Sequence, residues 1–516
     1  TNLATGVSTA STTNAEGAWV APFLTPGTYA LKVEHEGFKS VDRQPLQVRV
    51  ADRLRVDVVL EVGQLSDRVV VTAQAPLLET ASSNRGQVIT GRQITDLPLA
   101  SKNINRLVDL AAGVQFTGGM QFARPFDGGG SSSFVINGGR SSQNEWQLDG
   151  IPNNFTGGHG VSAVPPIEAT QEFKVQTNTY DAQYGRTSGG VISLSVKSGT
   201  NRPHGAAYEY LRRTGLNANS FANNASKTPR AFYTSDQYGF EVDGPVTLPK
   251  YKGRDRTFFM FALEKYRDQL PRPSLGSVPT AEQRRGDFSQ TRNANGSLRT
   301  IYDPLLIRPN PAFDPARPVT LSNLQYLRGA FAGNRVPESR MTPIALKVLA
   351  DIPAPNQTGD PVSNLNNWLG GGVTENNKNI SFIGRLDHSF NGSWKTFGRF
   401  NKEHRNGGQI DYYGWNTPAT SRSHGSERDD GAMADLVGTL SPTTIFNARF
   451  GVTWARQGST NYPYDMGSLG FPQSLLRQLQ NPNRYPIITF QDYLSTSRDD
   501  NTINSNVNYT ALANLV

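Results

Sequence analysis

The chain has 516 residues, enough for several domains, and its 51 basic and 43 acidic residues give a net charge of +8. Because the basic residues form no cluster with interleaved aromatic residues, we expect no nucleic-acid partner and assign the charge to solvated loops and a charged interior. The absence of cysteine excludes disulfide scaffolds, thiol nucleophiles and cysteine-based zinc sites, and no apolar run is long enough for a membrane-spanning helix.

Residues 1–62 alternate apolar and polar residues between closely spaced turns, and this pattern predicts a small antiparallel β-sandwich. We expect its strands in five segments: Val7–Thr13, Ala18–Phe23, Thr28–His35, Leu46–Val50 and Arg55–Val62. The first residues already read as the interior of a domain, so we expect a processed or truncated start and an N-terminally incomplete sandwich.

The linker expected at residues 63–76 contains a short valine segment. Its residues of interest are Asp67, Val69, Val70, Val71, Thr72 and Ala73. Because β-branched residues favour an extended backbone, this segment can pair with a neighbouring strand. Two interpretations stay open: an ordinary strand that leads into the next domain, or a strand that a partner protein captures by β-augmentation.

One helical region is predicted between residues 77 and 115. Apolar residues at i, i+3 and i+4 spacing favour helix at Thr90–Ile94 and again at Ile104–Gly113, where the glycine provides the stop. One face of the second helix is expected in a core: Ile104, Leu107, Val108 and Ala111.

Residues 134–200 consist of short apolar runs closed by glycine, asparagine or proline, a pattern that predicts strands and tight turns. The expected strands are Phe134–Ile136, Glu145–Leu148, Glu172–Gln176 and Val191–Val196. Between them lie Asn-Gly-Gly-Arg at 137–140, Leu-Asp-Gly at 148–150 and Tyr-Gly-Arg-Thr-Ser-Gly-Gly at 184–190. Each motif alone is unspecific, whereas their order along the segment is specific.

After residue 203 the chain changes to long alternating strands. In Thr443–Gln457, one face carries Phe446, Ala448, Phe450, Val452 and Trp454, and the other carries Asn447, Arg449, Gly451 and Thr453. An apolar face opposite a polar one is typical of a barrel strand that faces lipid on one side.

Similar strands are predicted at 204–213, 236–247, 256–268, 379–390, 394–405 and 431–441, with a weaker one after Asn504. Short turns at 248–255, 391–393 and 441–442 alternate with long excursions at 214–235, 269–378, 406–430 and 458–503. This alternation is typical of an outer-membrane barrel with short periplasmic turns and long extracellular loops. Within the longest excursion we expect some helix near Met341–Ala350.

The ordered motifs of residues 134–200 resemble the plug of the TonB-dependent outer-membrane receptors, a small domain that closes a large β-barrel. Residues 5–6, 14–17, 26–29 and 37–38 resemble part of a carboxypeptidase-regulatory-like domain, which points to the Oar-like group. The resemblance implies that TonB contacts the valine segment. It also implies a structural plug motif made of Gly139, Arg140, Asp149, Gly150, Gly185, Arg186, Gly189 and Gly190.

The expected fold is mainly β: a partial β-sandwich at 1–62, the linker at 63–76, an α/β plug at 77–203 and a transmembrane antiparallel β-barrel at 204–516. The largest extracellular loop would be 269–378. Plugged transporters have twenty-two strands, so we expect the barrel to be incomplete in this chain, with further strands beyond the sequence or on another chain.

The resemblance implies energy-coupled, gated passage of an unidentified ligand across a Gram-negative outer membrane, with TonB, ExbB/ExbD and outer-membrane lipid as partners. Six scattered histidines and the lack of a G-x-S-x-G motif argue against a metal site, a cofactor and an enzyme. A surface adhesin anchored by the barrel is the first alternative, favoured if the valine segment is buried in a sheet. A soluble multi-domain β protein is the second, favoured if the Phe446–Trp454 face packs against another sheet.

Overall fold

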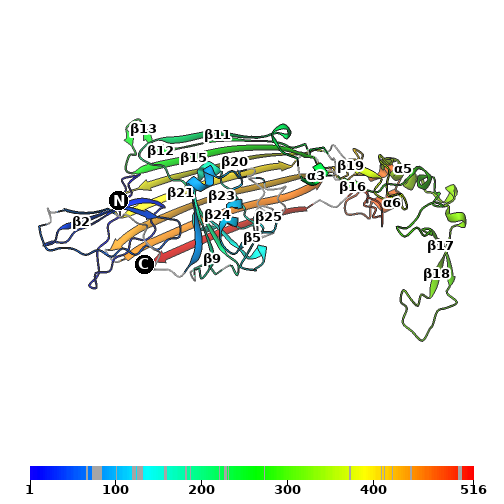
Figure 1. Ribbon diagram of the computed structural model, residues 1–516, viewed down its shortest axis with the longest axis horizontal. Helices are drawn as coiled ribbons and strands as arrows, with labels where there is room; N and C mark the ends of the chain where they lie inside the picture. Colours follow the sequence, from blue (N-terminus) through cyan, green and yellow to red (C-terminus); the bar gives the residue numbers. More distant parts are fainter. Residues whose placement is uncertain are drawn as a thin grey trace.

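The computed structural model of the chain describes residues 1–64, 68–72, 84–99, 102–118, 124, 132–155, 160–180, 183–185, 187–219, 221–225, 229–230, 232–271, 274–370, 374–407, 410–411, 413–420, 422–441, 444–497 and 502–516. The molecule is elongated, with a small N-terminal sheet at one end and a cap of long loops at the other (Figure 1). Between them, a wall of long strands lies beside a smaller central domain. In the part of the chain that the structure describes, no helix has the length and apolar character needed to cross a membrane.

The N-terminal sheet has three strands, β1 Gly27–Val33, β2 Ser40–Val48 and β3 Arg68–Thr72. β1 pairs with β2 in antiparallel fashion, and β3 pairs with the other edge of β2 in parallel. The strands predicted at Val7–Thr13, Ala18–Phe23 and Arg55–Val62 are wrong, because no strand forms there. Alternating residues favour an extended backbone, but a strand also needs a neighbour in register.

The central domain contains a five-stranded sheet in the order β4-β9-β10-β7-β8. Its strands are β4 Arg85–Thr90, β7 Glu145–Leu148, β8 Ile151–Pro152, β9 Thr170–Asn178 and β10 Val191–Val196. β10 runs parallel to β7 and antiparallel to β9. A separate hairpin pairs β5 Val114–Phe116 with β6 Phe134–Ile136. The strands predicted within residues 134–200 are therefore confirmed.

The predicted helical region forms two short helices. α1 Gly91–Asp96 begins after Thr90, whose hydroxyl accepts a hydrogen bond from the Gln93 backbone N–H. The helix predicted to stop at Gly113 is the 3-10 helix η2, which runs over Ile104–Leu110 and so ends earlier than expected. Gly113 instead has φ +79° in the turn before β5, a backbone conformation that glycine adopts at little cost.

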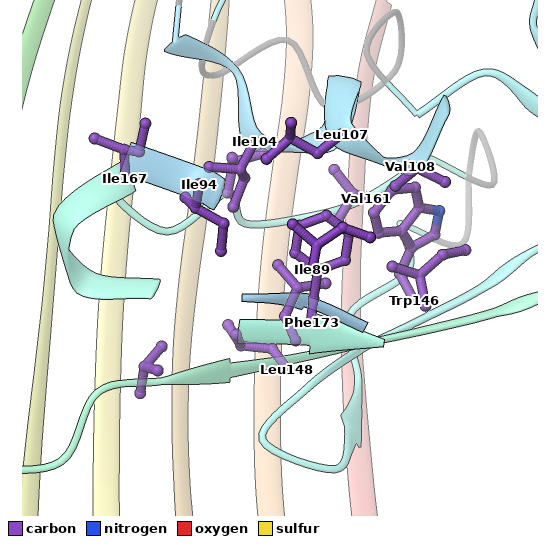
Figure 2. Close-up of a cluster of buried hydrophobic side chains, with 14 of the residues drawn as sticks. Ile89, Ile94, Ile104, Leu107, Val108, Trp146, Leu148, Val161, Ile167 and Phe173 are labelled. Carbon is purple, nitrogen blue, oxygen red and sulfur yellow. The ribbon is translucent and has the colours of Figure 1, made fainter. Parts of the chain in front are cut away.

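Side chains from both helices and from the five-stranded sheet share one hydrophobic core (Figure 2). The predicted buried face is confirmed, since Ile104, Leu107, Val108 and Ala111 are at most 3% exposed. Phe173 on β9 and Trp146 on β7 lie in the same cluster. This core makes the central domain a rigid support for the turns at its surface.

The wall is an antiparallel sheet in the order β11-β12-β15-β20-β21-β23-β24-β25, and the short strand β22 Ile410–Asp411 pairs with β23. Its long strands are β11 His204–Arg212, β12 Thr234–Pro245, β15 Thr257–Pro271, β20 Thr374–Ser389, β21 Trp394–Gly407, β23 Arg422–Ser441, β24 Thr444–Asn461 and β25 Thr502–Leu515. All eight predicted strands are confirmed. β11 and β25 are the two ends of this order, and no pairing joins them in the described residues, so the wall is open.

The outer face of the wall carries exposed apolar side chains, whereas its inner face carries polar side chains together with a few apolar ones, among them Met260 and Ala262. On β24, Phe450 is 54% exposed and Trp454 is 36% exposed, whereas Asn447 is buried. The predicted alternation is therefore confirmed, and the Phe446–Trp454 face does not pack against another sheet in the described structure. This removes the support that the soluble β-protein alternative required.

Connections at the end of the wall near the N-terminal sheet are short, and those at the other end are long. A small hairpin of β13 Thr247–Leu248 and β14 Tyr251–Lys252 joins β12 to β15 at the short-turn end. The long connection after β11 holds η6 Thr214–Leu216 and α3 Phe221–Ala225.

The long connections after β15, β21 and β24 fold together into the loop cap, with a core that includes Val348, Trp415 and Tyr485. Its elements are β16 Ser274–Gly276, α4 Ala281–Arg284, β17 Tyr302–Pro309, β18 Tyr326–Ala330, η7 Ala332–Asn334, η8 Glu338–Arg340, α5 Pro343–Asp351, β19 Trp368–Gly370, η9 Met466–Leu469 and α6 Gln473–Leu476. The helix predicted near Met341–Ala350 is confirmed by α5.

Candidate functional site between the central domain and the wall

The Leu-Asp-Gly motif forms the tight turn between β7 and β8. Asp149 has φ +50° and Gly150 has φ +77°, and a two-residue hairpin turn with both central residues in this region matches the twist of its strands. The Val196 backbone N–H donates to Asp149 Oδ1 at 3.0 Å, which fixes the carboxylate against β10. The turn therefore presents one carboxylate and one carbonyl toward the wall.

Three arginines of the wall converge on this turn. Arg399 Nη1 lies 3.0 Å from Asp149 Oδ2, and Arg385 Nη1 lies 3.5 Å from Asp149 Oδ1. Arg449 Nη1 donates to the Gly150 carbonyl at 3.2 Å. These arginines come from β21, β20 and β24, so a single turn is held by three strands of the wall.

The wall supplies two further carboxylates that balance the arginines. Asp387 lies 2.8 Å from Arg385 Nη2, and Asp435 lies 2.7 Å from Arg449 Nε. Three carboxylates and three guanidinium groups thus form one cluster, which we call the Asp149 cluster. The side chains of Asp149, Arg385 and Arg399 are at most 4% exposed. Because buried charges are tolerated when paired, removing Asp149 is costly: Arg399 loses the carboxylate 3.0 Å from it, while Arg385 and Arg449 keep Asp387 and Asp435.

Two glycines of the plug-like motif, Gly189 and Gly190, lie where an added side chain would collide with neighbouring atoms, and Gly139 lies beside them. A Cβ on Gly189 would lie 2.4 Å from Asn144 Oδ1, and one on Gly190 would lie 2.5 Å from Ile136 Cδ1. Gly139 packs beside Gly189 with its Cβ position 3.7 Å from the Gly189 Cα. These glycines let the turn at 137–140 and the turn at 184–190 approach each other.

The remaining motif residues make no comparable contact. Arg140 is exposed at the start of the 3-10 turn η4 Ser141–Gln143. Gly185 is exposed, and a Cβ there would meet open space. Arg186 lies outside the described residues. The structure thus brings Gly139, Gly189 and Gly190 together and places Asp149 and Gly150 at the wall.

Other polar contacts tie the central domain to the wall. Ser162 Oγ donates to Asp429 Oδ1 at 2.8 Å, and the Val164 backbone N–H donates to Glu403 Oε2 at 3.2 Å. Ser162 comes from the segment between β8 and the 3-10 turn η5 Ile167–Ala169. The interface combines these polar contacts with apolar ones, since Met260, Ala262 and Ile383 of the wall lie in the same hydrophobic cluster as the core of the central domain.

The N-terminal segment also contacts the central domain, through a second group that we call the N-terminal latch: Val50, Ala51, Asp52, Glu172 and Lys174. Lys174 Nζ lies 2.9 Å from Asp52 Oδ1 and donates to the Ala51 carbonyl at 3.3 Å. The Val50 backbone N–H donates to Glu172 Oε1. Burial is the main cause that raises the pKa of Glu172 to about 7, and this residue lies outside the wall strands.

The valine segment lies at the edge of the N-terminal sheet. Its described part, β3, pairs with β2 on one side, and no strand pairs with its other side in the described residues. Val70 is 54% exposed and Val69 is partly buried. Asp67 and Ala73 lie outside the described residues, and for Val71 and Thr72 the structure describes the backbone pairing alone. The segment is thus a paired edge strand and is not buried in a sheet interior.

Sequence reasoning missed the wall half of the Asp149 cluster. Arg449 was placed on the polar face of its strand by alternation, but Arg385, Arg399, Asp387 and Asp435 were not singled out. These four residues are charged and lie near the middle of predicted barrel strands, and this position is the sequence feature by which they could have been identified. In the described residues, no group of three or more histidine, aspartate or glutamate side chains could hold a metal ion.

Three family models match the chain in order. Residues 1–61 match the Carboxypeptidase regulatory-like domain, residues 79–191 match the TonB-dependent Receptor Plug Domain, and residues 195–516 match the Outer membrane beta barrel domain. The last match covers more than half of the chain. The Asp149 cluster thus joins residues of the plug match to residues of the barrel match.

Among curated proteins, the chain is similar to the TonB-dependent transporter Oar of Myxococcus xanthus, with 31% identity over 205 residues. That match covers 38% of this chain and 18% of the relative. The outer membrane transporter YddB of Escherichia coli has a TM-score of 0.44 at 11% identity, covering 73% of this chain and 40% of that one. A mutant of the ferric enterobactin receptor PfeA of Pseudomonas aeruginosa has a TM-score of 0.42 at 12% identity, covering 83% and 45%. The chain therefore spans less than half the length of these proteins.

Proposed function

The chain belongs to the TonB-dependent receptors of the Gram-negative outer membrane, and from this premise we propose that it is part of a transporter that passes an unidentified ligand through a plugged β-barrel. The observation that carries the proposal is the Asp149 cluster. It holds the plug against the barrel through charges and hydrogen bonds that can be exchanged for water.

The cap end is proposed to face the exterior and the N-terminal sheet to face the periplasm. The long connections gather at the cap end and the short turns at the other, which is the asymmetry of outer-membrane barrels. Ligand would arrive at the loop cap, and energy would arrive at the N-terminal side. The apolar outer face of the wall is proposed to contact outer-membrane lipid.

TonB, energised by ExbB/ExbD, is proposed to engage the valine segment at Asp67, Val69, Val70, Val71, Thr72 and Ala73. An edge strand offers its outer backbone groups for β-augmentation without first leaving its sheet. A pulling force on β3 would be transmitted to the N-terminal sheet. The N-terminal latch connects that sheet to β9 of the plug. The proposed path of force therefore runs from β3 through the latch to the plug.

No catalytic role is proposed. The buried carboxylates at the interface are engaged by arginines, hydroxyl groups and backbone N–H groups, as in the Asp149–Arg399 and Ser162–Asp429 contacts. Such carboxylates are held in structural contacts and are poorly placed for general acid–base chemistry.

A second candidate is an outer-membrane-anchored surface adhesin. The pairing of the valine segment with β2 is compatible with this function, but the segment is an edge strand and is not buried in a sheet interior. An adhesin would need no TonB, so a direct TonB-binding measurement separates the two functions.

The test is titration of the full-length protein in detergent with the purified periplasmic domain of TonB from the same organism. Val70→Pro removes a backbone donor from β3, and we expect about tenfold weaker binding or more. Val59→Pro is the matched control, since Val59 is 84% exposed and outside any strand. Equal binding by the parent and the Val70→Pro variant would contradict TonB contact at this segment.

A further inference from the structure

The β17–β18 hairpin projects from the loop cap away from the wall (Figure 1). It is a two-stranded sheet of its own, and no third strand pairs with it in the described residues. Several of its large side chains are exposed: Leu305 is 78% exposed, Ile307 58% and Tyr326 54%. An isolated hairpin is at best marginally stable in water, so a third strand would stabilise it.

The two edges of this hairpin differ. The Asn310 backbone N–H donates to the Gln325 carbonyl, and the Phe331 N–H donates to the Ile301 carbonyl. Because inward and outward backbone groups alternate along an antiparallel strand, Tyr326, Arg328 and Ala330 direct their N–H and C=O groups away from β17. These outward groups form the free edge of β18.

The outer edge of β17 is blocked by proline. Asn310 faces β18, so Pro309 falls at an outward position and has no N–H to donate. Pro304 interrupts the same strand nearer its start. β18 contains no proline, so strand addition is possible along β18 and is disfavoured along β17.

Two exposed arginines on the hairpin determine which side chains a strand added at the β18 edge can carry. Arg328 lies opposite Ile307 on one face of the hairpin, and Arg308 lies opposite Leu327 on the other. Both arginines are exposed. A strand added beside β18 would therefore place a central side chain next to Arg328, between Tyr326 and Ala330.

A second copy of the chain fits this edge poorly. Antiparallel pairing of two complete β18 edges would place Arg328 directly opposite Arg328, and like charges at opposed positions are destabilising. A carboxylate at that position would be attracted instead.

We propose that the β18 edge captures an extended peptide segment that carries a carboxylate between apolar or β-branched residues. The backbone groups of Tyr326, Arg328 and Ala330 would supply the pairing, and the Arg328 guanidinium would select the acidic side chain. This surface is separate from the Asp149 cluster and from the proposed TonB contact, so it does not depend on the transport function.

The test uses two fluorescent peptides of about seven residues, in which valine and threonine alternate around a central glutamate or a central lysine. Their binding to the full chain in detergent is measured by fluorescence anisotropy. We expect the glutamate peptide to bind about tenfold more tightly than the lysine peptide. Equal binding of both peptides, or no binding, would overturn the proposal.

Three variants separate the backbone and charge contributions. Ala330→Pro removes an outward N–H and should abolish binding of both peptides. Arg328→Glu changes an exposed side chain and should reverse the preference, whereas Arg308→Glu, on the other face, should leave the preference unchanged. Unaltered binding by Ala330→Pro, or an equal effect of the two charge reversals, would overturn the proposal.

Two other occupants are outcomes of the same series. If the unliganded chain is a dimer that Ala330→Pro converts to monomer, a second copy occupies the edge and the proposal is wrong. If vesicles of anionic lipid bind the chain and both charge reversals weaken that binding equally while no peptide binds, the hairpin contacts a lipid surface and the proposal is wrong.

Discussion

Two of the contacts that hold the plug, the Asp149 cluster and the N-terminal latch, are built differently. The Asp149 cluster joins a tight turn to three wall strands, and its carboxylates and guanidinium groups balance in number. The N-terminal latch joins a loop, with Ala51 at φ +53°, to two side chains of β9, and one of these is a carboxyl with a raised pKa. The charge-balanced Asp149 cluster lies on rigid strands and is expected to contribute most to the stability of the plug–wall contact. The latch depends on a titratable carboxyl and a loop, so a change of pH can open it.

The largest effect is expected from Asp149→Ala. The change leaves Arg385 and Arg399 buried beside each other without their shared carboxylate, and breaking a buried pair in this way costs about 3–5 kcal/mol. The free energy of unfolding from a denaturant titration measures it. The matched control is Asp57→Ala, because Asp57 pairs with Arg55 at the surface, where ion pairs contribute about 0–1 kcal/mol. Equal losses in the two variants would show that the cluster does not hold the plug.

A smaller effect is expected from Gly150→Ala. The φ of +77° is unfavourable for an L-residue by about 1–2 kcal/mol, and the added Cβ would lie 2.0 Å from Arg449 Nη1. Gly185→Ala is the control, since the added Cβ there meets open space. The same denaturant titration applies, and a neutral Gly150→Ala variant would mean that the turn is free to move away from the wall.

The smallest effect on overall stability, and the sharpest dependence on pH, is expected from Glu172→Gln. In the closed latch the Glu172 pKa is about 7, against an ordinary value of 4.5, and Asp52, Arg49 and Lys174 are the charged groups that act on it. Because the closed form binds the proton more tightly, closure is favoured at low pH and weakened as the pH rises from 4.5 to 7.

Hydrogen exchange at amides 49–52 measures latch opening. We expect opening to increase across that pH window in the parent and to stay constant in Glu172→Gln. Glu61→Gln, which changes an exposed carboxylate of the N-terminal region, should behave like the parent. A parent without pH dependence would contradict the assignment of the latch as the titratable contact.

The wall was predictable because lipid-facing strands must alternate, and every expected strand from 204 onward is present. The ends nearest the cap were not predictable. β23 begins at Arg422, well before the expected 431, because Arg422–Asp430 is polar on both faces and is held in the sheet by pairing with β21 and β24. The hydrophobic pattern in the sequence identifies the part of a strand that faces lipid. The polar part of the same strand is fixed by its pairing with neighbouring strands, which the sequence pattern does not reveal.

The plug residues of the site could be predicted from the sequence, but their partners on the wall could not. Tight turns have local signatures, so Asp149-Gly150 and the glycine pair at 189–190 could be singled out. Their partners could not, since Arg385 and Arg399 lie 236 and 250 residues from Asp149 in sequence. The N-terminal strands failed for the same reason: an alternating segment such as Arg55–Val62 carries no information about whether a neighbour is in register.

The most direct measurement of the central claim is maleimide labelling of Ser162→Cys in intact cells. The chain has no cysteine of its own, and Ser162 is 4% exposed at the contact with Asp429. Ser322→Cys, at an exposed position of the loop cap, serves as the always-labelled control. We predict that the thiol introduced by Ser162→Cys is protected in cells without TonB and becomes labelled in energised cells that contain TonB, because the plug then leaves the wall. Equal protection in both strains would contradict a plug that moves under TonB.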